Sequence, residues 1–164
     1  MFNVKKLAFG AALLAASAVC FAAPKVEIVT SEGNIVVNLN EKAAPTTVAN
    51  FVKYANEGFY NGTIFHRVIN NFMIQGGGFD RNLHQKSTHA PIKLEDKNGL
   101  KNTVGTIAMA RTNNPDSATS QFFINLKDND FLNGTSTKDG YAVLGEVVTG
   151  MDVVRKIGRA PTGS

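Results

Sequence analysis

Two neighbouring apolar runs carry the polar residues of this 164-residue sequence that are best suited to chemistry. Residues 65–69 read FHRVI and contain His66 and Arg67, and residues 72–78 read FMIQGGG and contain Gln75. If FHRVI is a strand, its alternation turns Arg67 to the same side as the large apolar residues at its two ends, and turns His66 to the other side. Arg67 is then either a charged side chain snorkelling from a sheet edge or a guanidinium held beside an apolar pocket. These residues alone leave both interpretations open.

The sequence supports few other kinds of catalytic site. It contains no Gly-x-Ser-x-Gly motif of the serine hydrolases. Its three histidines, His66, His84 and His89, lack the close spacing of metal ligands, and the last two are interpreted as surface residues of a polar loop. The three glycines at 76–78 are not followed by Lys and Ser or Thr, which argues against a phosphate-binding loop. We therefore expect no metal and no cofactor.

The first 22 residues have the anatomy of a secretory signal peptide. A short basic start precedes an uncharged apolar run over 7–19, and small residues follow up to Ala22. The run is shorter than the roughly 20 residues that a membrane-spanning helix needs, so no stable membrane anchor is expected. We predict cleavage after Ala22, which makes Ala23 the first residue of the mature chain, and we assign 23–164 to one domain.

Removal of this signal peptide changes the cysteine content and the charge. Cys20 is the only cysteine, so the mature chain has none and catalysis by a cysteine is excluded. The signal peptide also takes away Lys5 and Lys6 but no acidic residue, which lowers the formal net charge from +4 to +2. A charge this small, without a basic run, argues against nucleic acid or an anionic membrane as the main partner.

The elements that must position the polar side chains can be predicted from periodicity. Alternating apolar residues before and after a turn at 31–34 predict a β-hairpin over 26–39. Proline near the start and glycine past the end predict an amphipathic helix over 44–58. A second helix is predicted over 151–157, where three apolar residues share one face.

Between the two predicted helices, short apolar runs are separated by loops rich in glycine, asparagine, aspartate and threonine. This pattern is typical of a closed antiparallel sheet or barrel. The long polar stretch 76–103 is predicted to be either functional or packed by its own side chains. The apolar runs cover 63–69, 72–75, 104–110, 121–126 and 141–148.

Further blocks of sequence complete a family resemblance. Residues 105–111 read GTIAMAR and residues 120–125 read SQFFIN, and both stand in order with FHRVI, FMIQGGG, FLNG and GYAVLG. The sequence resembles the cyclophilins, which are peptidyl-prolyl cis/trans isomerases, and is most similar to their periplasmic bacterial branch. The resemblance runs from about Val26 to Ile157. It implies a mainly β fold, a closed antiparallel β-barrel of about eight strands capped by two α-helices.

The resemblance also implies roles for individual residues. Arg67 matches the family's catalytic arginine. Phe131 stands where many members have tryptophan and Tyr141 where many have histidine, and the loss of the indole N–H removes a hydrogen-bond donor that would favour cyclosporin. The substrate-binding residues that the resemblance implies are Phe72, Met73, Phe123 and Leu132 in a proline pocket, Phe131 and Tyr141 beside it, Gln75 and Gln121 next to the substrate backbone, and Ala110 and Arg111 in a neighbouring groove.

Besides Phe131 and Tyr141, the end of the chain also departs from the family pattern. The sequence stops at Ser164, where the family normally continues into a final strand that helps to close the barrel. Either the sequence given is incomplete, or one edge of the sheet lacks a partner strand.

The implied activity breaks no covalent bond. Rotation about an X–Pro amide meets a barrier of about 18–20 kcal/mol, and a fixed donor that favours the twisted amide lowers it. We predict a monomeric isomerase that acts on proline-containing unfolded or extended polypeptides in the periplasm, with Arg67 as the donor. The alternative is a chaperone-like binding module for such segments, with incidental isomerase activity.

Overall fold

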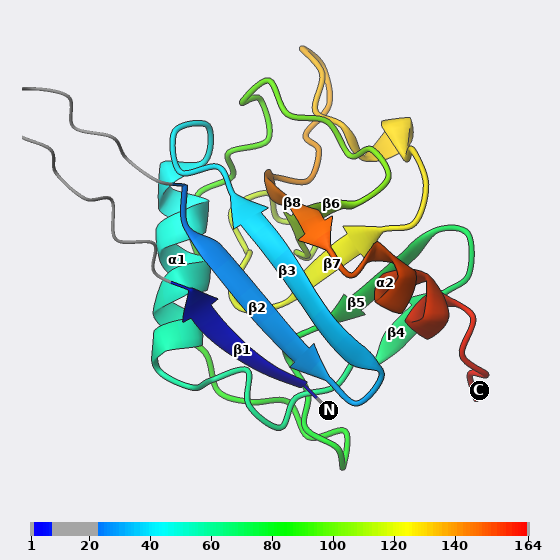
Figure 1. Ribbon diagram of the computed structural model, residues 1–164. Helices are drawn as coiled ribbons and strands as arrows, with labels where there is room; N and C mark the ends of the chain where they lie inside the picture. The colour runs from blue at the N-terminus through cyan, green and yellow to red at the C-terminus, as the bar shows by residue number, and fades with distance from the viewer. Residues whose placement is uncertain (1, 8–22, 164) are drawn as a thin grey trace, which may run out of the picture.

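The computed structural model describes residues 23–163, and residues 2–7 as backbone only. Most of the regular elements in these residues are strands. The strands curl into one sheet, and the two helices lie at opposite ends of this curled sheet in Figure 1. In chain order the elements are β1 (Phe2–Leu7), β2 (Lys25–Thr30), β3 (Gly33–Leu39), α1 (Pro45–Asn56), β4 (Arg67–Ile69), β5 (Met73–Gly76), β6 (Thr106–Met109), β7 (Phe122–Asn125), a 3-10 turn η1 (Asp130–Leu132), β8 (Val143–Thr149) and α2 (Met151–Gly158). The mainly β class, the hairpin and both helices agree with the sequence prediction.

The sheet is antiparallel throughout and runs in the order β1-β2-β3-β8-β6-β7-β5-β4. This order has two ends, β1 and β4, and no ladder of backbone hydrogen bonds joins them within the described residues. The sheet is therefore curled and open. The closed barrel that the sequence predicted is not confirmed, because closure requires every strand to have a partner on both sides.

The main hydrophobic core lies between one face of the sheet, here called the inner face, and the two helices. Alternate residues of each strand point to this face, as Phe122 and Ile124 of β7 do. Phe51 of α1 packs edge-on against Phe122 with the ring centroids 5.4 Å apart. Val154 of α2 is also fully buried in the core. The outer face of the same strands is left for a different set of side chains.

Helix α1 begins where a distant acidic residue meets its first turn. Pro45 stands at the first helical position, which needs no N–H donor. The Glu95 carboxylate accepts from the Thr47 backbone N–H at 2.7 Å and from the Thr47 hydroxyl at 2.6 Å. Gly58 follows the helix with a φ of +72°, a conformation that favours glycine. A tertiary contact thus provides the cap that the sequence near the helix lacks.

Strand β1 lies inside the predicted signal peptide. Its six residues pair antiparallel with all six residues of β2, from Phe2 opposite Thr30 to Leu7 opposite Lys25. In the full chain β2 is therefore covered on both edges, and removal of the signal peptide would leave its outer edge unpaired. The predicted apolar run and cleavage site fall mainly on residues 8–22, outside the described part of the chain. None of the described helices has the length and apolar character to cross a membrane.

The FHRVI segment departs from the predicted alternation at its first residue. Strand β4 begins only at Arg67, and Phe65 packs against the inner core together with Val68. Arg67 and Ile69 are exposed on the opposite side. The prediction that Phe65 shares the face of Arg67 is therefore wrong, because the chain has not yet entered the strand at that position.

The long stretch 76–103 is packed by local contacts. Asp80 Oδ1 accepts from the backbone N–H groups of Asn82 and His84 at 2.8 and 3.0 Å. Lys86 Nζ donates to the carbonyl oxygen of Phe59, and its ammonium lies 4.7 Å from the centroid of the Phe59 ring. These contacts explain how a stretch with little regular secondary structure keeps one path over the surface.

Candidate active site

A single row of side chains crosses five strands on the outer face. The strand register places Arg67 opposite Gln75, Gln75 opposite Phe123, Phe123 opposite Ala108, and Ala108 opposite Val143. Residues that are directly opposite in an antiparallel sheet project to the same face, so all five lie on one side. Arg67 thus stands at one end of the row. Gln75 follows it, and the remaining three residues are apolar.

A second, smaller apolar cluster includes the three apolar residues of this row and is the candidate proline pocket. Phe123 is 4 % exposed, and its ring meets that of Tyr141 edge-on with centroids 5.7 Å apart. Phe72 stacks against Phe131 at 5.7 Å. Phe131, at 58 % exposure, forms the rim rather than the floor. The cluster consists of Met73, Ala108, Phe123, Leu132 and Val143, with Phe72, Leu100, Ala110 and Tyr141 packed against it.

Two glutamines continue the polar side of the site. Gln75 Nε2 donates to Gln121 Oε1 at 2.9 Å, while Arg67 Nη1 lies at the longer distance of 3.5 Å from Gln75 Oε1. Gly78 makes room for this arrangement, since a Cβ atom there would lie 2.5 Å from Cγ of Gln121. The guanidinium of Arg67 is exposed and presents several donors beside the pocket.

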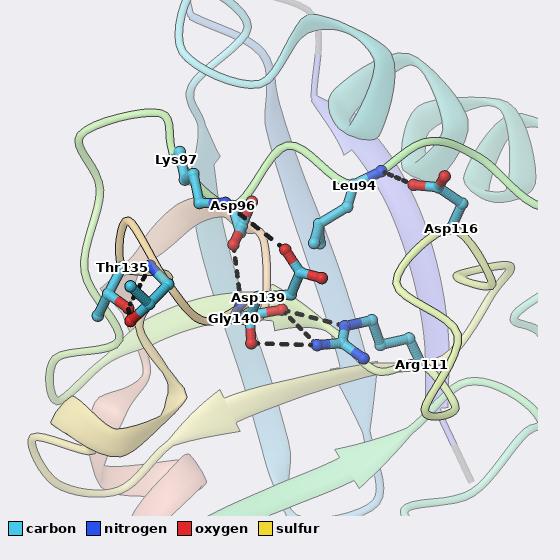
Figure 2. A network of polar contacts seen from close by, with 9 residues as sticks. Leu94, Asp96, Lys97, Arg111, Asp116, Thr135, Asp139 and Gly140 are labelled. Carbon is cyan, nitrogen blue, oxygen red and sulfur yellow. Dashed lines mark hydrogen bonds and ion pairs between the residues drawn. The ribbon is translucent and has the colours of Figure 1, made fainter.

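Arg111 is engaged with the protein backbone rather than projecting freely into a groove (Figure 2). Its Nε and one terminal nitrogen donate to the carbonyl oxygen of Gly140 at 3.0 and 2.9 Å. The N–H of Gly140 donates in turn to Asp96 Oδ2 at 2.7 Å. The guanidinium also lies 4.6 Å from the centroid of the Tyr141 ring. Arg111 therefore supports the segment that carries Tyr141.

His66 lies next to Arg67 in the chain but outside the row. Its ring packs against Phe79 with centroids 4.5 Å apart, and its Nδ1 is buried with no hydrogen-bond partner among the described residues. Burial, and secondarily the charge of Arg67, lower the pKa of His66 from its ordinary value. These surroundings favour a neutral, packed ring.

The structure thus brings together most of the residues that the sequence singled out. Arg67, Gln75 and Phe123 share the row, and the remaining predicted pocket residues form or touch the small apolar cluster. The sequence reasoning missed three buried asparagines, Asn102, Asn125 and Asn129, which lie behind the pocket. The only sequence signal for this group was Asn125, a polar residue at the end of the apolar run SQFFIN. Among the described residues, no three His, Cys, Asp or Glu side chains are grouped to hold a metal ion.

A hollow of about 1030 Å³ opens next to the Val143 end of the row, between the end of β3 and the loop around Lys101, and Val143 and Leu100 are among its lining residues. It is lined partly by charged residues, including Lys42 and Glu146, and contains none of the predicted site residues. The row on the outer face, rather than this hollow, therefore contains the residues that the sequence singled out.

Comparison with known proteins agrees with this geometry. The family model described as cyclophilin type peptidyl-prolyl cis-trans isomerase/CLD matches residues 25–164. A peptidyl-prolyl cis-trans isomerase of Acinetobacter baylyi is 56% identical over 98% of this chain and 86% of its own length. The peptidyl-prolyl cis-trans isomerase B of Escherichia coli is 61% identical over 82% of this chain and 84% of its own.

Solved structures show the same relationship at lower identity. A cyclophilin type peptidyl-prolyl cis-trans isomerase of Cryptosporidium parvum, crystallised in the presence of the dipeptide Ala-Pro, superposes with a TM-score of 0.72 and 26% identity. The match covers 85% of this chain and 87% of that one. A cyclophilin of Hirschia baltica gives a TM-score of 0.72 at 25% identity over 85% of this chain and 70% of its own. The chain described here belongs to the cyclophilin-type peptidyl-prolyl cis-trans isomerase family.

Proposed function

We propose that this isomerase accelerates rotation of X–Pro bonds in exported polypeptides, with Arg67 as the catalytic donor. The observation that carries the proposal is the row in which Arg67, Gln75 and Phe123 stand side by side on one face. It brings a charged donor close to the apolar cluster that contains Phe123. The Cryptosporidium relative crystallised with Ala-Pro supports a proline-containing peptide as the occupant of such a pocket.

The proposed mechanism follows from the resonance that the amide loses as it twists. A planar amide delocalises the nitrogen lone pair, whereas a twisted amide returns that lone pair to nitrogen. A donor aimed at the proline side of the bond therefore stabilises the twisted state more than either planar state. Arg67 suits this role because its guanidinium stays charged and offers a rigid fork of donors. Phe72, Met73, Phe123 and Leu132 would hold the pyrrolidine ring while the other side of the bond rotates.

The test is the isomerisation of a proline tetrapeptide by Arg67→Ala. We expect kcat/KM to fall by about 100-fold or more, which is the usual effect of removing a preorganised donor, while peptide affinity falls much less. Arg155→Ala, which removes an exposed arginine from α2, is the matched control and should behave like the wild type. Activity of Arg67→Ala within twofold of the wild type would refute the role of Arg67.

We further propose export to the periplasm with removal of residues 1–22. The basic start and the uncharged apolar run support this proposal. Cell fractionation followed by N-terminal sequencing should recover the protein in the periplasmic fraction with Ala23 as its first residue. Recovery of an uncleaved chain in the cytoplasm would contradict it.

A chaperone-like function is the second candidate, and the exposed rim of the pocket favours it. Phe131 is 58 % and Ile69 39 % exposed, so two large apolar side chains on this side of the molecule are open to solvent. Such surface could hold an extended chain without isomerising it. Suppression of aggregation of an unfolded client by Arg67→Ala, at the level of the wild type, would show that binding is separable from catalysis. Loss of both activities together would favour isomerisation as the sole function.

A further inference from the structure

Three asparagine side chains form a continuous hydrogen-bonded chain behind the pocket. Asn102, Asn125 and Asn129 are each at most 1 % exposed. Asn129 Nδ2 donates to Asn125 Oδ1 at 2.9 Å, and Asn125 Nδ2 donates to Asn102 Oδ1 at 3.1 Å. Asn125 Nδ2 also donates to the hydroxyl of Thr106 at 2.9 Å. We call these three residues the asparagine chain.

Both ends of the asparagine chain bond to the backbone of pocket residues. At one end, Asn129 Nδ2 donates to the carbonyl oxygen of Phe72 at 3.0 Å. At the other end, Asn102 Nδ2 donates to the carbonyl oxygens of Leu132 at 3.2 Å and Tyr141 at 3.3 Å. Phe72 and the distant pair Leu132 and Tyr141, which share a backbone hydrogen bond of 2.9 Å, are thus tied to one buried group of side chains.

The position of the asparagine chain in the sheet places it directly beside the catalytic row. Asn125 is opposite Met73, and Phe123, two residues earlier on β7, is opposite Gln75. Asn125 therefore projects to the same outer face as the row and lies one step along the strands from it.

The chemistry of the amide explains why asparagine is suited to this place. A side-chain amide both donates and accepts, so it can pass from one residue to the next and still reach backbone carbonyls. Buried networks of this kind favour one arrangement of the segments they join, because each broken bond leaves a desolvated polar group. Asn129 makes its side-chain bonds through Nδ2, and its Oδ1 has no partner among the described residues. The side-chain link to Phe72 therefore depends on one nitrogen, beside the backbone N–H of Leu126, which donates to the same carbonyl oxygen at 2.9 Å.

We propose that Asn102, Asn125 and Asn129 act as one positioning unit that holds Phe72, Leu132 and Tyr141 in register around the proline ring. This inference rests on the proposed function of the pocket and adds residues that do not touch the substrate. A pocket that clamps a ring during rotation must keep its walls fixed to within a fraction of an ångström. Hydrogen bonds to the backbone restrain these walls more directly than apolar packing does.

The experiment compares Asn129→Ala, Asn102→Ala and the double variant with the wild type at a temperature where circular dichroism shows all of them folded. We expect KM for a proline tetrapeptide to rise by about 3- to 10-fold in each single variant, as the loss of about one hydrogen bond implies, with a smaller change in kcat because Arg67 is untouched. The double variant should lose less than the product of the two single losses, since both break the same unit.

Thr47→Val is the matched control. It removes a buried hydroxyl bonded to Glu95 at the start of α1, away from the pocket. We expect it to lower the melting temperature and leave KM unchanged. Asparagine variants that likewise lose only thermal stability, with the KM of the wild type, would overturn the positioning role.

A second readout separates this inference from the proposed function. Methyl resonances of Met73 and Leu132 report on the pocket in the absence of substrate, and both residues lie in the small apolar cluster. Asn129→Ala should shift and broaden them, whereas Thr47→Val should not. If the wild type failed to isomerise the tetrapeptide, the proposed function would fall, and unchanged methyl resonances in Asn129→Ala would overturn the positioning unit.

Discussion

Gln75 and Gln121 are joined by a 2.9 Å hydrogen bond from Nε2 to Oε1, between strand β5 and the residue that precedes β7. This bond leaves Gln75 Oε1 facing Arg67 Nη1 at 3.5 Å. The hydrogen bond between the two glutamines is therefore shorter than the contact between Gln75 and Arg67. Because the Arg67 contact is long, the guanidinium keeps freedom to reach a substrate.

The first prediction concerns the glutamine pair. Gln121→Leu keeps the approximate volume and removes the acceptor of Gln75, so Gln75 can rotate away from Arg67. We expect kcat/KM on a proline tetrapeptide to fall by about 3- to 10-fold, the equivalent of roughly one hydrogen bond. Gln121→Glu, which retains an acceptor, should lose less. Equal losses of kcat/KM in the two variants would show that the hydrogen bond from Gln75 to residue 121 does not contribute to activity.

A second prediction addresses Arg111, which donates twice to Gly140 and stacks on Tyr141. Arg111→Lys keeps the charge but loses the planar fork, so we expect KM to rise several-fold as the Tyr141 segment loosens. Lys97→Ala is the control, since its pair with Asp139 at 3.5 Å is exposed and contributes little. Figure 2 shows that Lys97 and Arg111 come from different segments and contact the adjacent residues Asp139 and Gly140. A wild-type KM for Arg111→Lys would contradict the support of Tyr141.

The third prediction follows from the lowered pKa of His66. Burial is the larger cause and the charge of Arg67 the smaller one. Because the folded pKa lies below the unfolded value of about 6.5, the unfolded chain binds more protons as the pH falls through that value. The free energy of unfolding should therefore decrease below about pH 6.5 and level off once the pH is below the folded pKa.

Urea unfolding between pH 8 and pH 5 measures this dependence. His66→Gln should flatten the fall in stability with pH. His84→Gln, at a histidine whose side chain is 79% exposed, should leave it unchanged. The same slope in His66→Gln as in the wild type would assign the pH dependence to another group.

The fourth prediction concerns the edge that β1 covers. In a chain of residues 23–164 the outer edge of β2 loses its six-residue partner. Unpaired edges promote association, so we expect the sedimentation coefficient of this chain to rise with protein concentration, in contrast to the monomer expected from the sequence. A melting temperature and sedimentation coefficient that do not vary with concentration would show that the edge is protected in another way.

The sequence by itself determined the local elements and the chemistry. The alternation of strand residues and the residues that start and end helices are local patterns, each a few residues long. The hairpin, both helices and most apolar runs could therefore be predicted from residue spacing. The residue types of FHRVI and SQFFIN, read through the family resemblance, pointed to an arginine beside an apolar pocket. The alternation failed at Phe65 because a strand boundary depends on partners that lie elsewhere in the chain.

Only the tertiary structure decided how these pieces meet. The row from Arg67 to Val143 depends on the register of five strands, and no single segment encodes that register. The cap that Glu95 provides for α1 spans 48 residues. The asparagine chain joins residues 102, 125 and 129 to the backbone of pocket residues. Hydrogen bonds between distant residues form only once the backbone has brought them together, which is why the sequence pattern could not reveal them.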